Sequence, residues 1–211
     1  YMSDDLIKVN KDGSKKYYDI IQGSRESFEK KGVDFKKIGQ DVKTHHQDFF
    51  EKSIKDLDLN ANKLKDDDFL KIGEKFAKEK GLDAQAFRYP TFLDTSHRSV
   101  KIKLDESLEG NVMALQSWTA DALNDDSDGD IPSIVFNLKD DGHMRSKTDK
   151  ITIAHKKLME NQAKENSQRI DGLIEGYNSN NFATSIDDFN KKYAEQQGET
   201  IKGLDKVSNK S

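Results

Sequence analysis

The sequence changes character at Ser146, and this change constrains the fold more than any other feature. Before it, short apolar runs alternate with turns that contain Asp and Gly, as in domains that mix helices and strands. After it, Ser146 and Asp149 form a capping pattern ahead of a helical stretch that runs to Tyr177 and is polar in its middle. We therefore predict one long helix over residues 146–177.

A second helix is predicted after the polar break at residues 178–181. Its apolar stripe is narrow, closer to a coiled-coil seam than to the face of a core helix. Two long helices joined by a short polar loop form an antiparallel αα-hairpin. The predicted domains are accordingly residues 1–145, a globular α+β domain, and residues 146–211, the hairpin.

The first domain shows the apolar spacing of helices and the alternation of strands. Val100, Ile102 and Leu104 alternate with lysines, which indicates a strand with one solvated face. The predicted strands are residues 4–9, 17–21, 87–93, 99–104 and 131–138. The predicted helices are residues 24–32, 34–57, 67–80 and 108–123. The fold class is α+β and mainly helical, with a small, largely antiparallel sheet, packed helices and the C-terminal hairpin.

The stretch 131–138 is the most strand-like in the chain. Ile134, Val135 and Phe136 are consecutive, so both faces of this strand are expected to be covered, which places it at the centre of the sheet. Ile134 and Phe136, or Val135 on the opposite face, are the predicted core residues.

A short motif occurs twice, 34 residues apart. Residues 34–39 (DFKKIG) match residues 68–73 (DFLKIG) at five of six positions. The spacing resembles a helical-repeat period, but only two copies are present. Two interpretations stay open: chance similarity in a chain rich in Lys and Asp, or a duplicated helical hairpin.

Composition excludes several classes of function. Charged residues make up 35% and hydrophobic residues 33% of the chain, so we expect a thin core built around eleven Phe, six Tyr and one Trp. The net charge is −4 and no basic stripe is present, which does not support binding to nucleic acid. The absence of cysteine excludes disulfides, thiolate metal sites and Cys nucleophiles. No apolar run approaches the roughly 18 residues of a transmembrane segment.

Residues 124–131 resemble the first part of an EF-hand calcium loop. Oxygen ligands at Asn124, Asp126, Asp128 and Asp130 alternate before and after a glycine turn, which is how such loops converge on a hard cation. The match then fails, because Val135 stands where the bidentate Glu is expected. A weak Ca²⁺ site and a solvated acidic turn are the two interpretations.

Asp94, Ser96, His97 and Arg98 bring a carboxylate, a hydroxyl, an imidazole and a guanidinium together in a predicted loop. Loops often carry catalytic groups. However, a nucleophile needs its base within hydrogen-bond reach, and neighbouring side chains usually diverge. These four residues are weak catalytic candidates for a hydrolase or transferase, and a polar turn is the alternative.

The function predicted from the sequence is protein–protein interaction or scaffolding. The reason is a thin core beside a long hairpin whose apolar stripe must be buried, either by a protein partner or by self-association. The predicted contact residues are Phe189, Tyr193, Ile201 and Leu204. A Lys-rich chain without cysteine is compatible with an exported bacterial effector or surface protein.

Overall fold

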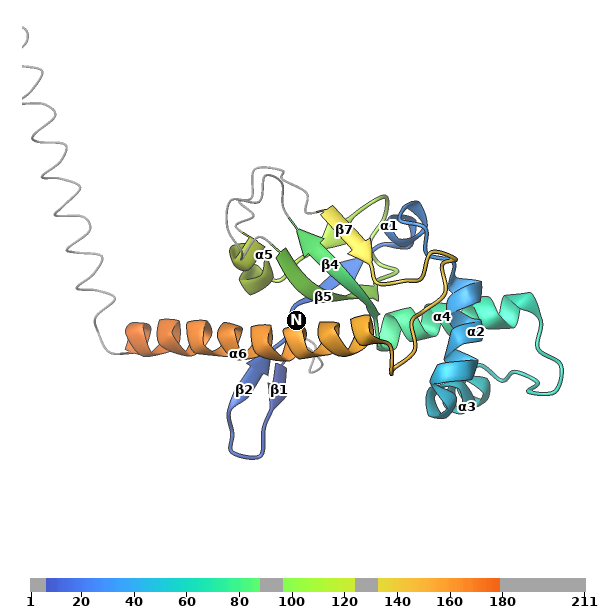
Figure 1. Cartoon of the computed structure of the whole chain (residues 1–211), viewed down its shortest axis with the longest axis horizontal. Coiled ribbons are helices and arrows are strands. Elements are labelled where there is room, and N and C mark those ends of the chain that lie inside the picture. Colours follow the sequence, from blue (N-terminus) through green and yellow to red (C-terminus); the bar gives the residue numbers. More distant parts are fainter. Residues whose placement is uncertain (1–6, 88–96, 124–132, 179–211) are drawn as a thin grey trace, which may run out of the picture. The chain divides into compact units, whose positions relative to one another are not determined.

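The computed structural model describes residues 7–87, 97–123 and 133–178 (Figure 1). The chain divides into two compact units, residues 1–166 and 167–211. The first unit contains the sheets and the start of the last helix, so it extends past the predicted boundary at residue 145. The second predicted helix of the C-terminal hairpin, with Phe189, Tyr193, Ile201 and Leu204, lies outside the described residues.

A β-hairpin opens the described chain and begins with the strand predicted over residues 4–9. Strands β1 (Ile7–Val9) and β2 (Lys15–Tyr17) pair antiparallel, and Gly13 adopts the positive φ of +83° that the turn requires. The predicted second strand continued to Ile21. Instead, the chain leaves this hairpin after Tyr17 and enters a different sheet as β3 (Ile20–Gly23).

The main sheet has five strands in the order β6-β3-β5-β4-β7. The others are β4 (Leu82–Phe87), β5 (His97–Leu104), β6 (Met113–Ala114) and β7 (Ser133–Phe136). β3 and β5 run parallel and the remaining pairs run antiparallel, so the sheet is mixed and not largely antiparallel. The helices between β3 and β4 provide the long crossover that a parallel pair needs. Alternation of side chains does not reveal strand direction.

Four helices form this crossover. They are α1 (Arg25–Lys30), α2 (Phe35–His45), α3 (Gln47–Asp56) and α4 (Asp66–Glu79). Ser24 caps α1 and Asp34 caps α2 through hydrogen bonds from their side chains to backbone N–H groups. The single helix predicted over residues 34–57 is wrong, because His46 leaves helical geometry (φ −135°, ψ 56°) and separates α2 from α3.

The repeated motif has a clear structural role. α2 and α4 cross at Gly39 and Gly73, the last residues of the two copies (Figure 1). A Cβ atom on Gly39 would lie 1.9 Å from the carbonyl oxygen of Phe69, and one on Gly73 would lie 1.9 Å from that of Phe35. The glycine of each copy therefore contacts the backbone of the other copy, at the residue that follows its Asp.

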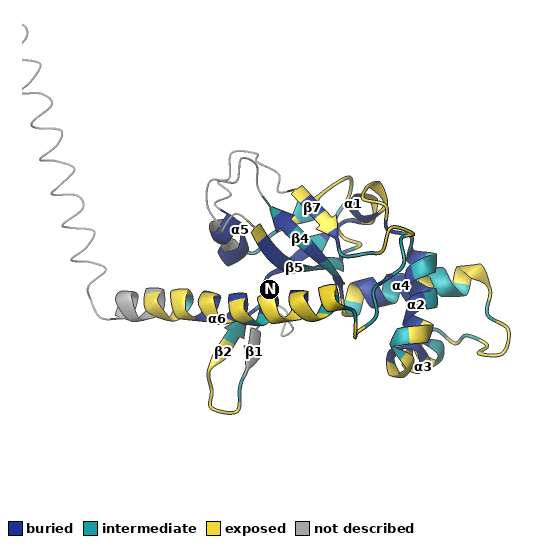
Figure 2. Cartoon of the chain, in the orientation of Figure 1, coloured by how far each residue is buried: buried dark blue, intermediate teal, exposed yellow. Residues whose placement is uncertain are grey.

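The core lies between these helices and one face of the sheet (Figure 2). Ile134 and Phe136 are buried, as predicted, but β7 is an edge strand of the main sheet and Val135 is 53% exposed. The prediction of a central strand covered on both faces is therefore wrong, because the face of β7 that carries Val135 is open to solvent. Residues 108–123 do not form the predicted single helix either. They contain β6 and α5 (Ser117–Leu123), where Trp118 is buried and donates to the carbonyl oxygen of Tyr18.

The last described helix, α6 (Lys150–Asn178), confirms the first helix of the predicted hairpin. Asp149 begins it by accepting a hydrogen bond from the Ile151 N–H at 2.8 Å. The residues of its first part that are buried share one side of the helix: His155, Met159, Gln162, Ala163 and Asn166. Their polar members contact the second face of the sheet and its rim, opposite the apolar core.

None of the described helices is both long and apolar enough to cross a membrane.

Candidate functional site

The structure separates the two described members of the predicted 94–98 site. His97 is exposed at the start of β5, with its ring 6.3 Å from that of Phe87, whereas the adjacent Arg98 is buried. Asp94 and Ser96 lie outside the described residues, as do the predicted calcium ligands Asn124, Asp126, Asp128 and Asp130. Across the described residues, no group of three acidic or histidine side chains is placed to hold a metal ion.

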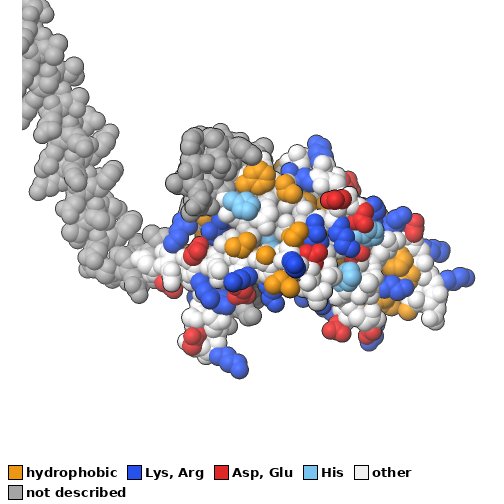
Figure 3. All heavy atoms as spheres, viewed as in Figure 1, with side chains coloured by type: hydrophobic (Ala, Val, Ile, Leu, Met, Phe, Trp, Pro, Cys, Tyr) orange, Lys and Arg blue, Asp and Glu red, His pale blue; other side chains and the backbone are white. Residues whose placement is uncertain are grey.

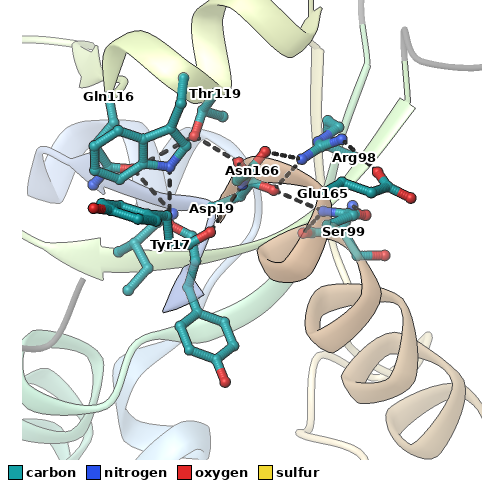
Figure 4. A network of polar contacts seen from close by, with 12 residues as sticks. Tyr17, Asp19, Arg98, Ser99, Gln116, Thr119, Glu165 and Asn166 are labelled. Carbon is teal, nitrogen blue, oxygen red and sulfur yellow. Dashed lines mark hydrogen bonds and ion pairs between the residues drawn. The ribbon is translucent and has the colours of Figure 1, made fainter. Parts of the chain in front are cut away.

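Arg98 belongs instead to a buried polar network around Asp19 (Figure 4). Its Nη2 donates to Asp19 Oδ2 at 2.7 Å and to Asn166 Oδ1 at 2.9 Å. Thr119, Gln162 and Asn166 also donate to the Asp19 carboxylate, at 2.9, 2.9 and 3.2 Å. A buried charge is tolerated when it is paired and hydrogen-bonded, and Asp19 satisfies both conditions. The network thus joins β5, α5 and α6 to the start of β3.

The same helix holds the rim of β5. Ser99 donates its N–H to Gln162 Oε1 at 2.9 Å, and Gln162 returns a bond to the Ser99 carbonyl oxygen at 2.8 Å. Nothing in the sequence indicated a role for Asp19, Gln162 or Asn166, because their partners lie far away along the chain. Through the hydrogen bonds of Arg98, Gln162 and Asn166, the network holds α6 on the sheet.

The candidate site is a cavity of about 970 Å³ on one flank of α6, here called the α6 cavity. Its floor is the second face of the sheet, including Asp83 and Lys101, and one wall is α6 from Thr152 to Asn161. The end of α4, His46 and the segment 137–147 complete it. It has the size of a typical small-molecule site, which spans roughly 300–1,000 Å³.

Cations outnumber anions around this cavity. The basic lining residues are Lys80, Lys101, Lys103, Arg145, Lys147, Lys156 and Lys157, and the acidic ones are Glu79, Asp83 and Glu160. The apolar part of the lining includes Phe76, Leu82, Leu138, Met144 and Met159. A largely apolar cavity with a surplus of positive charge suits a ligand that carries both an apolar body and negative charge.

His155 lies in the wall of the α6 cavity and is only 2% exposed. Its Nδ1 accepts from the side-chain amides of Gln85 (3.1 Å) and Asn137 (3.0 Å). Ser99 Oγ donates to Gln85 Oε1, which fixes the orientation of that amide. Because Nδ1 is an acceptor, the neutral ring carries its proton on Nε2. Burial lowers the pKa of His155, and Asp83, whose Oδ1 lies 3.5 Å from Nε2, opposes this effect.

His46 is the second histidine of the cavity lining. Its ring packs on Phe76 with 4.7 Å between ring centroids. Desolvation and the positive charges of Lys147 and Lys101 lower the pKa of His46 to about 4. Both histidines are therefore neutral near pH 7. The sequence did not indicate either one, because the lysines and amides that surround them come from distant segments of the chain.

The opposite flank of α6 carries an exposed apolar patch. Ile151 and Leu158 precede and follow His155 by one turn and are 45% and 48% exposed. Val135 lies opposite Gln85 on the same face of the sheet, and Gln85 contacts His155. Figure 3 shows hydrophobic side chains at the surface of the described part of the molecule. We call Val135, Ile151 and Leu158 the α6–β7 patch.

Comparison of the chain with known protein families finds no matching family model, and comparison with curated proteins finds no match.

Proposed function

We propose that this chain is a protein-interaction module and that its partner binds the α6–β7 patch. The observation that carries the proposal is the exposure of three branched side chains on α6 and on the edge strand β7. Val135, Ile151 and Leu158 are three of the five large hydrophobic residues that are exposed in the described chain.

The patch fits the usual anatomy of an interaction site. Its three branched side chains belong to two elements, a helix and an edge strand, and these elements are held together by the contacts of His155 with Gln85 and Asn137. A firmly held apolar cluster can bind a partner with little loss of conformational entropy. A few such anchors supply most of the binding energy of an interface.

The second contact region in this proposal is the predicted stripe of residues 186–207. Phe189, Tyr193, Ile201 and Leu204 supply aromatic and aliphatic anchors of the type found at interfaces. Replacing Phe189 and Tyr193 with Ser should weaken binding to a partner or self-association and leave the thermal unfolding of residues 1–166 nearly unchanged. A global loss of structure would show that these residues stabilise the fold instead.

The decisive test compares two flanks of one helix. We would prepare Ile151→Ser/Leu158→Ser and, as the control, Ile153→Ser. Ile153 is 55% exposed, compared with 45% for Ile151, and lies on the flank that lines the α6 cavity. Sedimentation velocity over a range of concentrations measures self-association. Pull-down from an extract, with each variant immobilised, measures a separate partner.

We expect the double variant to lose association and the Ile153→Ser control to keep it. Equal association of all three proteins, or equal loss in both variants, would refute the α6–β7 patch as the interface. Circular dichroism of each variant separates loss of binding from loss of folding.

The enzyme alternative has less support. Arg98 is held by Asp19 and Asn166, and the exposed His97 points away from it, so the described half of the 94–98 group is not assembled for catalysis.

A further inference from the structure

We propose that the α6 cavity binds a small organic anion: an apolar body, aromatic or branched aliphatic, that carries one acidic head group. This site is separate from the α6–β7 patch and lies on the other flank of the helix. Three independent features of the described residues support it: an unbalanced charge, a buried donor without an acceptor, and an apolar interior of suitable size.

The positive charge of the cavity is not cancelled by its acids. Glu160 is neutralised by Lys16 at 2.8 Å and also accepts from the Tyr18 hydroxyl at 2.7 Å. Glu79 forms an ion pair with Lys75 on α4. Because neither of these lysines lines the cavity, two of its three acids are satisfied from outside. Asp83 is held by Lys101 at 2.6 Å.

Several lining lysines have no such partner. Lys147 and Lys156 form no ion pair with any described residue, and the charge of Lys147 contributes to the depressed pKa of His46. A cavity with low-dielectric walls focuses this positive potential and concentrates anions within it. An anionic head group is the ligand feature that this potential selects.

One buried donor in the cavity lining lacks an acceptor. Arg145 Nε is inaccessible to solvent and forms no hydrogen bond within the described chain. Buried N–H groups in native proteins nearly always have a partner, and an acceptor supplied by a ligand would provide one here.

The rest of the lining specifies the body of the ligand. Phe76, Leu82, Leu138 and Met159 offer aromatic, branched and flexible apolar surface. A simple inorganic anion would leave this surface hydrated within a cavity of about 970 Å³. The combination therefore selects an amphipathic organic anion.

The test uses two dyes that share one aromatic body. Anilinonaphthalene sulfonate carries an acidic head group, and N-phenylnaphthylamine is its uncharged counterpart. Fluorescence titration of the full chain would measure the Kd of each dye for three proteins: wild type, Lys147→Gln/Lys156→Gln, and Lys150→Gln/Lys164→Gln. The last is the matched control, because it removes two exposed lysines of α6 that do not line the cavity.

We expect the anionic dye to bind the wild type at one site and to bind the Lys147→Gln/Lys156→Gln variant roughly tenfold more weakly, as expected for loss of charge-assisted contacts. The control variant should retain the wild-type Kd for this dye, and the neutral dye should bind all three proteins alike. Amide chemical-shift changes should centre on residues 152–159.

Three outcomes would overturn the proposal. The anionic dye could fail to bind, it could bind both double variants with equal loss, or its shift changes could centre on the α6–β7 patch. The substituted lysines are exposed, so thermal unfolding of both variants should match the wild type. This test does not depend on the protein partner proposed above.

Discussion

Replacing Arg98 with Met should destabilise the protein strongly, although the substitution preserves much of the side-chain volume. Arg98 and Asp19 form a salt bridge of 2.7 Å, with side chains only 6% and 0% exposed. Removing one partner of a buried pair costs roughly 3–5 kcal/mol, because a charge stays behind without compensation. We expect a loss near 3 kcal/mol, the lower end of that range, since Thr119, Gln162 and Asn166 still donate to Asp19.

Urea unfolding followed by circular dichroism measures this change in the free energy of unfolding. The matched control is Lys30→Met, which removes an ion pair with Glu26 of the same 2.7 Å length, but with side chains 58% and 48% exposed. An exposed pair of this kind contributes about 0.3–0.5 kcal/mol, so the control should be nearly neutral.

The double variant Asp19→Asn/Arg98→Met completes the cycle. Because it removes both charges, its loss should fall well below the sum of the two single losses. Simple additivity, or a loss under about 1 kcal/mol for Arg98→Met alone, would refute the argument that burial makes this pair important.

Three further results are expected. Gly39→Ala and Gly73→Ala should each lower stability by about 1–3 kcal/mol through overpacking at the helix crossing, whereas Gly172→Ala, where a Cβ has open space, should be neutral or stabilising in the same thermal-unfolding assay. Stability should fall as the pH is lowered from about 6.5 to about 4, because the pKa of His46 drops from 6.5 to about 4 on folding and the unfolded chain takes up the proton first. His46→Gln should flatten this part of the plot of stability against pH, and an unchanged plot would contradict the lowered pKa of His46. A weak calcium site at residues 124–130 should give a small rise in Tm at millimolar calcium that Asp126→Ala/Asp128→Ala abolishes, and no rise in the wild type would identify a solvated turn.

Local structure was the part of the fold that the sequence predicted. Helices were predicted to begin at residues 24 and 34, and the side chains of Ser24 and Asp34 cap α1 and α2 at these positions. These features depend on hydrogen bonds between residues only a few positions apart. The start of α6 follows in the same way from the capping residue Asp149.

Features that depend on distant partners could not be predicted. The parallel pairing of β3 with β5 joins segments separated by four helices, and alternation of side chains carries no directional information. Val135 continues an apolar run, yet its exposure depends on the edge position of β7.

The candidate site shows the same limit. His155 is a lone histidine in a polar helix, and its partner Gln85 lies 70 residues away. Only the fold brings these residues and the lysines of the α6 cavity together. His97 and Arg98 show the opposite case. They are adjacent in the sequence, which suggested a shared site, but the side chain of His97 is exposed and that of Arg98 is buried.

The polar docking of α6 sets its axial position uniquely. An apolar helix can slide along an apolar surface, since one methyl group substitutes for another at modest cost. His155, Gln162 and Asn166 each meet directional partners, and a shift by one helical turn, about 5.4 Å, would break all of these bonds together. The helix therefore has a single stable alignment on the sheet, and this alignment fixes both the dimensions of the cavity on one flank and the spacing of the apolar side chains on the other.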